Sequence, residues 1–363
     1  MLARLAEDLY WAGRYLERLQ HTARVLDVTT ESVFTSPRVD QREIWERALA
    51  TLVLDHTFAE HYETVDGTTV SGFCVIDTEN PGSIASLIRA LRENVRRVRE
   101  LVSSELWESV NDLYLRFFAT NVRRDLDDHP AQLYAFVKSA AHAVIGVAVE
   151  TMTRDDASRF FELGMHMERS GTTTRVLGTQ AAALELRAKS GLEAWAPVLR
   201  TCAARESFVR TGRQADAASV ATLLLFSPVF PRSVRYSVCV ADEHITLLLA
   251  EAVTFTAGTP DEEHPLVARR MGRLRGRLDY GDIGEVITVG LAATAVSLET
   301  DLRAVHKAIA ERFFHHTPVG ELQVQELRSM EPELRCGSTS ATGPASATTR
   351  PCRSRTTSCG PAR

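Results

Sequence analysis

Three short segments from the first part of the chain recur about 150 residues later, in the same order. The first contains Glu17-Arg18 and returns around Glu168-Arg169, displaced by 151 residues. Its shared positions are Gly13, Glu17, Arg18, Thr22, Arg24, Val25 and Leu26, which match Gly164, Glu168, Arg169, Thr173, Arg175, Val176 and Leu177. Trp45 and Leu49 match Trp195 and Leu199, and Asn80-Pro81-Gly82-Ser83-Ile84 is echoed by Phe230-Pro231-Arg232-Ser233-Val234, both displaced by 150. A fixed offset is typical of repeated structural units, so the sequence predicts an internal duplication.

The repeated segments lie in runs with helical periodicity. Apolar or small residues in the first run are spaced alternately by three and four positions, at Leu2, Leu5, Leu9, Ala12, Leu16, Leu19, Ala23 and Leu26. Comparable runs cover about 40–62, 82–122, 131–178, 190–226, 231–256 and 263–313, whereas Val70 to Ile76 is ambiguous between strand and helix. Pro81 and Pro231 are expected in the first turn of a helix. The predicted fold is therefore all-α, an internally duplicated pseudo-twofold helical bundle.

Composition favours a folded chain with one helical domain over residues 1–320, in halves of about 1–150 and 151–320. The 363 residues are 44% hydrophobic and 25% charged, enough to bury a substantial core. From about residue 336 the tail is rich in Ser, Thr, Pro and Arg, and it includes Cys336, Cys352 and Cys359. We therefore expect 321–363 to be a C-terminal extension, disordered from about 336.

Charge and targeting signals predict a cytoplasmic protein that binds neither nucleic acid nor membrane. The net charge is only -5, which provides no basic surplus for nucleic acid or anionic lipid. Glu7 and Asp8 interrupt the apolar segment that a secretion signal needs. The apolar stretch from Val286 to Leu298 is shorter than the roughly 18–20 residues that cross a bilayer.

The two Glu-Arg pairs are the candidate functional residues. Adjacent helical positions diverge by about 100°, so Glu17 and Arg18 cannot pair with each other. Gly13 and Gly164 each precede a Glu by one turn, where a glycine costs about 1 kcal/mol relative to alanine. We infer that two helices approach closely there, and we predict that Glu17 meets Arg169 while Glu168 meets Arg18.

Three interpretations of these pairs stay open. The residues could fix the register of a helix pair, or lie on the solvated surface. Alternatively they line a polar cleft that binds a carboxylate or phosphate, together with Arg14, His21, Arg24 and Arg175. Because Met165 stands where the first segment has Arg14, such a site would be asymmetric.

Other familiar chemistries lack a sequence basis. No Glu lies three residues before a histidine, as a helical di-iron site requires, so no metal is predicted. The chain has neither a Walker-type nor a Rossmann-type glycine loop, and its isolated cysteines, Cys74, Cys202 and Cys239, form no catalytic motif. We accordingly expect no cofactor.

These residues give the chain a resemblance to the Alpha-E family, bacterial helical proteins named for a characteristic Glu-Arg motif. The similarity extends over residues 1 to about 320. It rests on Ala6 to Arg18, the Asn80 to Ile84 corner, Arg92-Glu93-Asn94, Ser104 to Trp107 with Asn111, Arg159-Phe160-Phe161, Gly164 with Glu168-Arg169, and Phe230 to Val234. By this resemblance, Arg92, Glu93 and Asn94 are expected to join the cleft.

The resemblance implies a role but no established activity. Family members are associated with ATP-grasp and transglutaminase-like proteins, which implies an accessory or binding protein in the synthesis or modification of a peptide or another amide-linked compound. Two alternatives remain. One is an enzyme that uses Glu17 or Glu168 as a general base toward an anionic substrate, and the other is a structural scaffold.

Overall fold

The computed structural model describes residues 1–35, 40–119, 121–186, 191–255 and 265–314. Within these ranges the chain is helical and has no strand, so the predicted all-α class is confirmed. The first half contains α1 (Ala3–Thr35), α2 (Gln41–Leu52), α3 (Asp55–His61), α4 (Gly67–Val75), α5 (Ile84–Arg97), α6 (Ser104–Ala119), α7 (Val122–Asp128) and α8 (Pro130–Thr151). The second contains α9 (Asp156–Val176), η1 (Leu177–Ala181), α10 (Ala182–Leu186), α11 (Leu192–Thr201), α12 (Arg205–Val209), α13 (Ala217–Ala221), η2 (Thr222–Phe226), α14 (Val234–Phe255), α15 (Leu266–Asp279), α16 (Ile283–Val289) and α17 (Leu291–Phe313). The segments η1 and η2 are π-helical.

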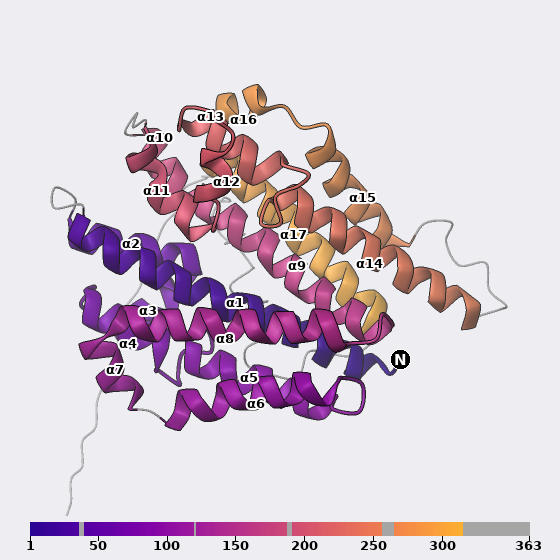
Figure 1. The fold of residues 1–363 in the computed structure, drawn as a ribbon. Coiled ribbons are helices and arrows are strands. Elements are labelled where there is room, and N and C mark those ends of the chain that lie inside the picture. Colours follow the sequence, from indigo (N-terminus) through magenta and orange to yellow (C-terminus); the bar gives the residue numbers. More distant parts are fainter. Residues whose placement is uncertain (36–39, 120, 187–190, 256–264, 315–363) are drawn as a thin grey trace, which may run out of the picture.

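Helices α1 and α9 form the centre of the molecule and pack more extensively against each other than any other pair does. The remaining helices of the first half gather mainly around α1, with α5 and α8 in direct contact with it. Those of the second half gather around α9, with α14 and α17 in direct contact with it (Figure 1). A helix surrounded in this way buries all its faces, which is why polar residues of α1 and α9 must find partners inside the protein.

Capping residues explain where several helices begin. Asp66 accepts hydrogen bonds from Thr68 and Thr69 at the start of α4, and Asp216 accepts one from Ser219 at the start of α13. Such side-chain oxygens satisfy backbone N–H groups that have no partner within the helix.

The prediction that Pro81 and Pro231 lie in the first helical turn is wrong. Both prolines lie in turns, and the helices begin after Ser83 and Ser233. The Ser83 hydroxyl oxygen accepts from the Ser86 N–H at 3.2 Å, and that of Ser233 accepts from the Tyr236 N–H at 3.0 Å. A serine cap provides the acceptor that the free N–H groups need, and proline cannot do so.

Several expected helical runs are broken. The run 40–62 divides where Val53 adopts a left-handed conformation, with φ of 58°, and the run 131–178 divides between α8 and α9. The ambiguous stretch Val70 to Ile76 is mostly helical and belongs to α4, in which Val70 to Val75 are all buried. Apolar periodicity predicted the helices correctly in these places. It did not reveal where they break, because a short turn does not interrupt the apolar pattern.

Helix α8 is the helix in the described ranges that is long and apolar enough, by itself, to cross a membrane. The successive helices α16 and α17 pass the same test only together, and they are bent by 107°. One face of α8 packs against α1 and α6 through Tyr134, Val137, Ala141 and Val144. The predicted extension 321–363, with its three cysteines, lies outside the described residues.

Candidate functional site

Two glycines allow the backbones of α1 and α9 to touch. A Cβ atom on Gly13 would overlap the carbonyl oxygen of Phe161, and one on Gly164 would overlap that of Tyr10. The contact is reciprocal, because each carbonyl belongs to the residue three positions before the opposite glycine. One turn later along each helix, Glu17 and Glu168 therefore project across a very short distance between the helix axes.

Glu168 lies in a group of arginines. Its Oε2 atom accepts from Nε and Nη2 of Arg14 at 2.9 and 2.7 Å. Arg18 donates from Nε to Oε1 and from Nη2 to Oε2, both at 2.9 Å. Arg175, two turns further along α9, donates to Oε1 at 3.4 Å. Three guanidinium groups thus hold one carboxylate that has no exposed side-chain surface.

Glu17 has a different set of partners. Arg169 donates to its Oε2 from Nη2 at 2.7 Å and from Nε at 3.2 Å. Arg232, from the turn before α14, donates to Oε1 of Glu17 and, at 2.9 Å, to Oε1 of Gln20. The predicted crossed pairs, Glu17 with Arg169 and Glu168 with Arg18, are therefore both present.

The arginines keep both carboxylates ionised. Burial by itself would raise the pKa of Glu17, but Arg169 and Arg232 outweigh it and hold this pKa far below its ordinary value. Burial likewise opposes ionisation of Glu168, and Arg18 and Arg14 lower its pKa strongly. By contrast, burial and the positive charges of Arg175 and Arg232 lower the pKa of His21 to about 3, so this imidazole is neutral at pH 7.

Several buried donors near the pairs have no acceptor. Nε2 of Gln20, Nε of Arg24 and Nε of Arg175 lack a hydrogen-bond partner among the described residues, as does Nε2 of His21. Arg24 lies seven residues after Glu17, as Arg175 lies after Glu168. Because Arg232 and Arg169 already occupy Glu17, Arg24 has no corresponding carboxylate. Burial, followed by the repulsion of Arg232, lowers the pKa of Arg24 to about 10, so it remains a cation.

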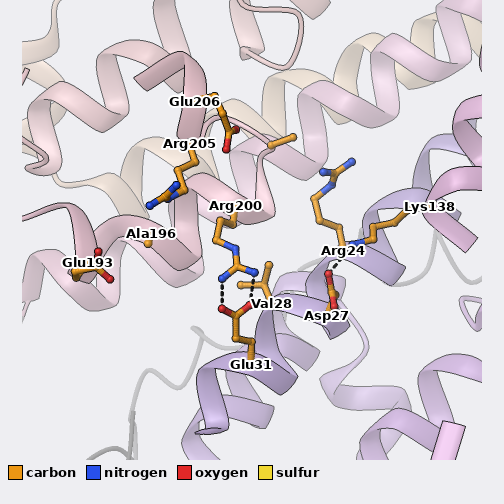
Figure 2. Close-up of a pocket in the computed structure, with 11 residues that line it drawn as sticks. Arg24, Asp27, Val28, Glu31, Lys138, Glu193, Ala196, Arg200, Arg205 and Glu206 are labelled. Carbon is orange, nitrogen blue, oxygen red and sulfur yellow. Dashed lines mark hydrogen bonds and ion pairs between the residues drawn. The ribbon is translucent and has the colours of Figure 1, made fainter. Parts of the chain in front are cut away.

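Arg24 lines a pocket of about 520 Å³ between α1, α11 and α12. Figure 2 shows Arg24 and Lys138 on one side and Glu193, Arg205 and Glu206 on the other. The remaining lining residues are Asp27, Val28, Glu31, Ala196, Arg200 and Ala203. The polar strip of α1 that begins at Glu17 thus continues into an open pocket two turns later.

A family model described as "A predicted alpha-helical domain with a conserved ER motif" matches residues 1–314. The chain belongs to this Alpha-E family. The crossed pairs are formed by two Glu-Arg dipeptides, Glu17-Arg18 and Glu168-Arg169, of the kind that this description names.

Relatives of this Alpha-E chain are uncharacterized proteins of Mycobacterium bovis and of two strains of Mycobacterium tuberculosis. They are 28%, 28% and 27% identical to it over 332 residues, which cover 85% of this chain. The matched region covers 36% of each relative, so the chain spans about a third of their length. No solved structure matches the chain.

Most residues predicted for the Alpha-E cleft lie together. Hydrogen bonds join Arg14, Arg18, Glu168 and Arg175 in one group and join Glu17 to Arg169 in the other. His21 and Arg24 follow Glu17 on successive turns of α1, and both are influenced by its charge.

The structure does not bring Arg92, Glu93 and Asn94 into this cluster. Arg92 donates to Asn111 at 2.8 Å and stacks on Trp107 and Tyr114 of α6. Glu93 accepts from Arg96 on its own helix, and Asn94 is buried on α5. Residues of α6 bind the side chain of Arg92, and Arg96 binds that of Glu93. These residues therefore stabilise α5 and its packing against α6.

Sequence reasoning missed two residues of the cluster. Arg232 stands at the position where the first Pro corner has Gly82, and this difference between the two segments is the signal that marks it. His306 of α17 accepts or donates at 2.9 Å with the Tyr10 hydroxyl, beside Arg14. It is an isolated histidine in an amphipathic helix, and its spacing gives no indication of this contact.

Proposed function

We propose that this chain is a binding protein that holds an anionic group in the pocket between α1, α11 and α12. The observation that carries the proposal is Arg24, which lines the pocket and whose buried Nε atom has no hydrogen-bond partner among the described residues. A buried guanidinium N–H without an acceptor is costly, and a ligand carboxylate or phosphate supplies that acceptor.

The charge behind the pocket supports the same function. Six arginines surround two buried glutamates in this cluster: Arg14, Arg18, Arg24, Arg169, Arg175 and Arg232 around Glu17 and Glu168. His21 adds no positive charge to this surplus, since it is neutral at pH 7. The positive surplus of this cluster, behind the pocket wall, attracts anions toward Arg24.

The same geometry argues against catalysis by the glutamates. A general base works best with a pKa near the working pH, whereas the pKa values of Glu17 and Glu168 are strongly lowered and their oxygens accept from arginines. Burial also raises the pKa of Cys74 and Cys202 to about 12, which leaves no thiolate at pH 7. Binding therefore accounts for these residues better than turnover does.

We further propose that the bound ligand is handed to a partner enzyme, an ATP-grasp-type ligase or a transglutaminase-like protein, which makes or modifies a peptide or another amide-linked compound. In the mycobacterial relatives the matching region forms 36% of a longer chain. There the region that corresponds to the proposed binding protein is covalently joined to the rest of the relative. Tethering raises the effective concentration of a ligand-bearing domain beside its partner. Co-purification with an ATP-grasp-type protein from the same genome is expected, and its absence at low salt would count against this partner.

Calorimetric titration with inorganic phosphate and with glutarate tests the anion site. We expect saturable binding that Arg24→Met weakens at least tenfold. The control Arg116→Met changes an exposed arginine of α6 and is expected to leave the affinity unchanged. Equal affinities for the wild-type and Arg24→Met proteins would contradict the proposal, and a folded Arg24→Met protein that does not bind excludes a purely structural role for Arg24.

We also infer that the two halves arose by duplication. In support, the pairs α2 and α11, α3 and α12, α4 and α13, and α5 and α14 begin 150 or 151 residues apart. The left-handed residues Val53 and Ala203 are likewise separated by 150 positions. A structural superposition of 1–151 on 156–313 that fails to align these helices would contradict common origin.

A further inference from the structure

The charges of the pocket between α1, α11 and α12 fall into two groups, and the first is internally paired. Lys138 of α8 donates to Asp27 at 2.5 Å. Arg200 of α11 forms a two-pronged ion pair with Glu31 of α1 (Figure 2). These two pairs tie the walls of the pocket together and leave no net charge for a ligand.

The second group is unpaired. Arg24, Arg205, Glu193 and Glu206 line the pocket, and none of their side chains forms a hydrogen bond or ion pair within the described ranges of the chain. Arg24 is largely buried at the α1 wall, whereas Glu193 and Glu206 are exposed on α11 and α12. The pocket therefore offers one largely buried cation at the α1 wall, and two exposed carboxylates together with the exposed Arg205 at the other wall.

The uncharged part of the lining is small. It consists of Val28, Ala196 and Ala203, with no aromatic ring. Nucleotide bases and other flat apolar groups are usually held by aromatic or extensive apolar surfaces. A volume of about 520 Å³ is within the range of pockets that take small molecules, and this lining suits a small ligand that is polar at both ends.

We propose that this pocket binds a zwitterion, an α-amino acid or short peptide, with its carboxylate on Arg24 and its ammonium group beside Glu193 and Glu206. The inference rests on the proposed anion-binding function and specifies its ligand. A polyanion fits less well, because the unpaired carboxylates of Glu193 and Glu206 repel additional negative charge and outnumber Arg205, the unpaired cation beside them. A zwitterion instead matches both signs of unpaired charge.

Calorimetry on the full chain with trialanine, N-acetyl-trialanine and trialanine amide tests the two ends separately. We expect trialanine to bind, and we expect acetylation or amidation to weaken binding at least tenfold. In the double variant Glu193→Gln with Glu206→Gln, acetylation is expected to have little further effect. Inorganic phosphate should still bind this variant through Arg24. The matched control is Glu105→Gln with Glu108→Gln on the exposed surface of α6, which is expected to retain the wild-type preference.

The outcomes separate this inference from the function on which it rests. If N-acetyl-trialanine binds as tightly as trialanine while phosphate binding still depends on Arg24, zwitterion recognition is wrong and anion binding stands. If neither phosphate nor trialanine binds, both proposals are wrong. Loss of trialanine binding in the control double variant would also overturn the assignment, because that surface lies on another helix.

Discussion

The carbonyl oxygen of Phe161 occupies the space that a Cβ atom on Gly13 would need. The same relationship holds in reverse between Tyr10 and Gly164. A backbone carbonyl cannot move aside as a flexible side chain can, so these glycines determine how closely α1 and α9 pack. The Glu-Arg pairs one turn away depend on that spacing.

Gly13→Ala and Gly164→Ala are each expected to destabilise the protein by about 3 kcal/mol or more, since the helices must separate to admit a methyl group. Chemical denaturation measures the change. Gly146→Ala in α8 and Gly272→Ala in α15 are matched controls, because nothing lies within 4 Å of a Cβ atom at either position. The controls should be stabilised slightly, by up to about 1 kcal/mol, through helix propensity. A loss of stability in the controls equal to that in Gly13→Ala would refute the close-packing explanation.

Glu17→Gln is expected to cost about 3–5 kcal/mol at pH 7, because Arg169 and Arg232 lose a buried partner. The lowered pKa of Glu17 also predicts a pH dependence. Its stabilisation is complete above the unfolded-state value of about 4.3 and is lost as the pH falls further. Below about pH 4 the wild type should therefore lose about 1.4 kcal/mol per pH unit more than Glu17→Gln. Parallel unfolding curves for the two proteins from pH 4 to pH 3 would contradict ionisation of Glu17.

His21 predicts a second pH dependence, at higher pH. Its folded-state pKa of about 3 lies below the ordinary value of 6.5, so the unfolded chain takes up a proton first as the pH falls. Stability from the neutral imidazole is complete above about pH 6.5 and declines toward pH 3. Compared with His21→Gln, the wild type should lose about 1.4 kcal/mol per pH unit between pH 6 and pH 4. Identical slopes would show that the pKa of His21 is not lowered in the folded protein.

The crossed pairs were predictable because periodicity and the fixed offset place Glu17-Arg18 and Glu168-Arg169 at matching points of two helices, each after a glycine. The sequence could not reveal that Arg232 would reach Glu17, because a turn residue has no helical face to predict its direction. Arg92 shows the opposite error: its motif suggested the cluster, but the aromatic side chains of α6 and Asn111 bind it instead. Local patterns identified the helices, whereas tertiary contacts between distant turns determined the partners.

Arg24 is expected to reduce stability in the absence of a ligand. Its Nε atom is buried without an acceptor, and an unsatisfied buried donor costs about 1–3 kcal/mol. Arg24→Met keeps most of the packing volume of the side chain and removes the charge, so it should raise the free energy of unfolding by about 1 kcal/mol or more.

Arg18→Met is the matched comparison, since Arg18 lies on the same helix but donates to the buried Glu168. It should lower the free energy of unfolding by about 2 kcal/mol, less than for an isolated pair because Arg14 and Arg175 still hold that carboxylate. Urea denaturation of both variants measures the difference. The two substitutions should change the free energy of unfolding with opposite signs only if Arg18 stabilises the fold and Arg24 serves to bind a ligand. Equal destabilisation by the two substitutions would mean that Arg24 stabilises the fold, and the anion site would lose its main support.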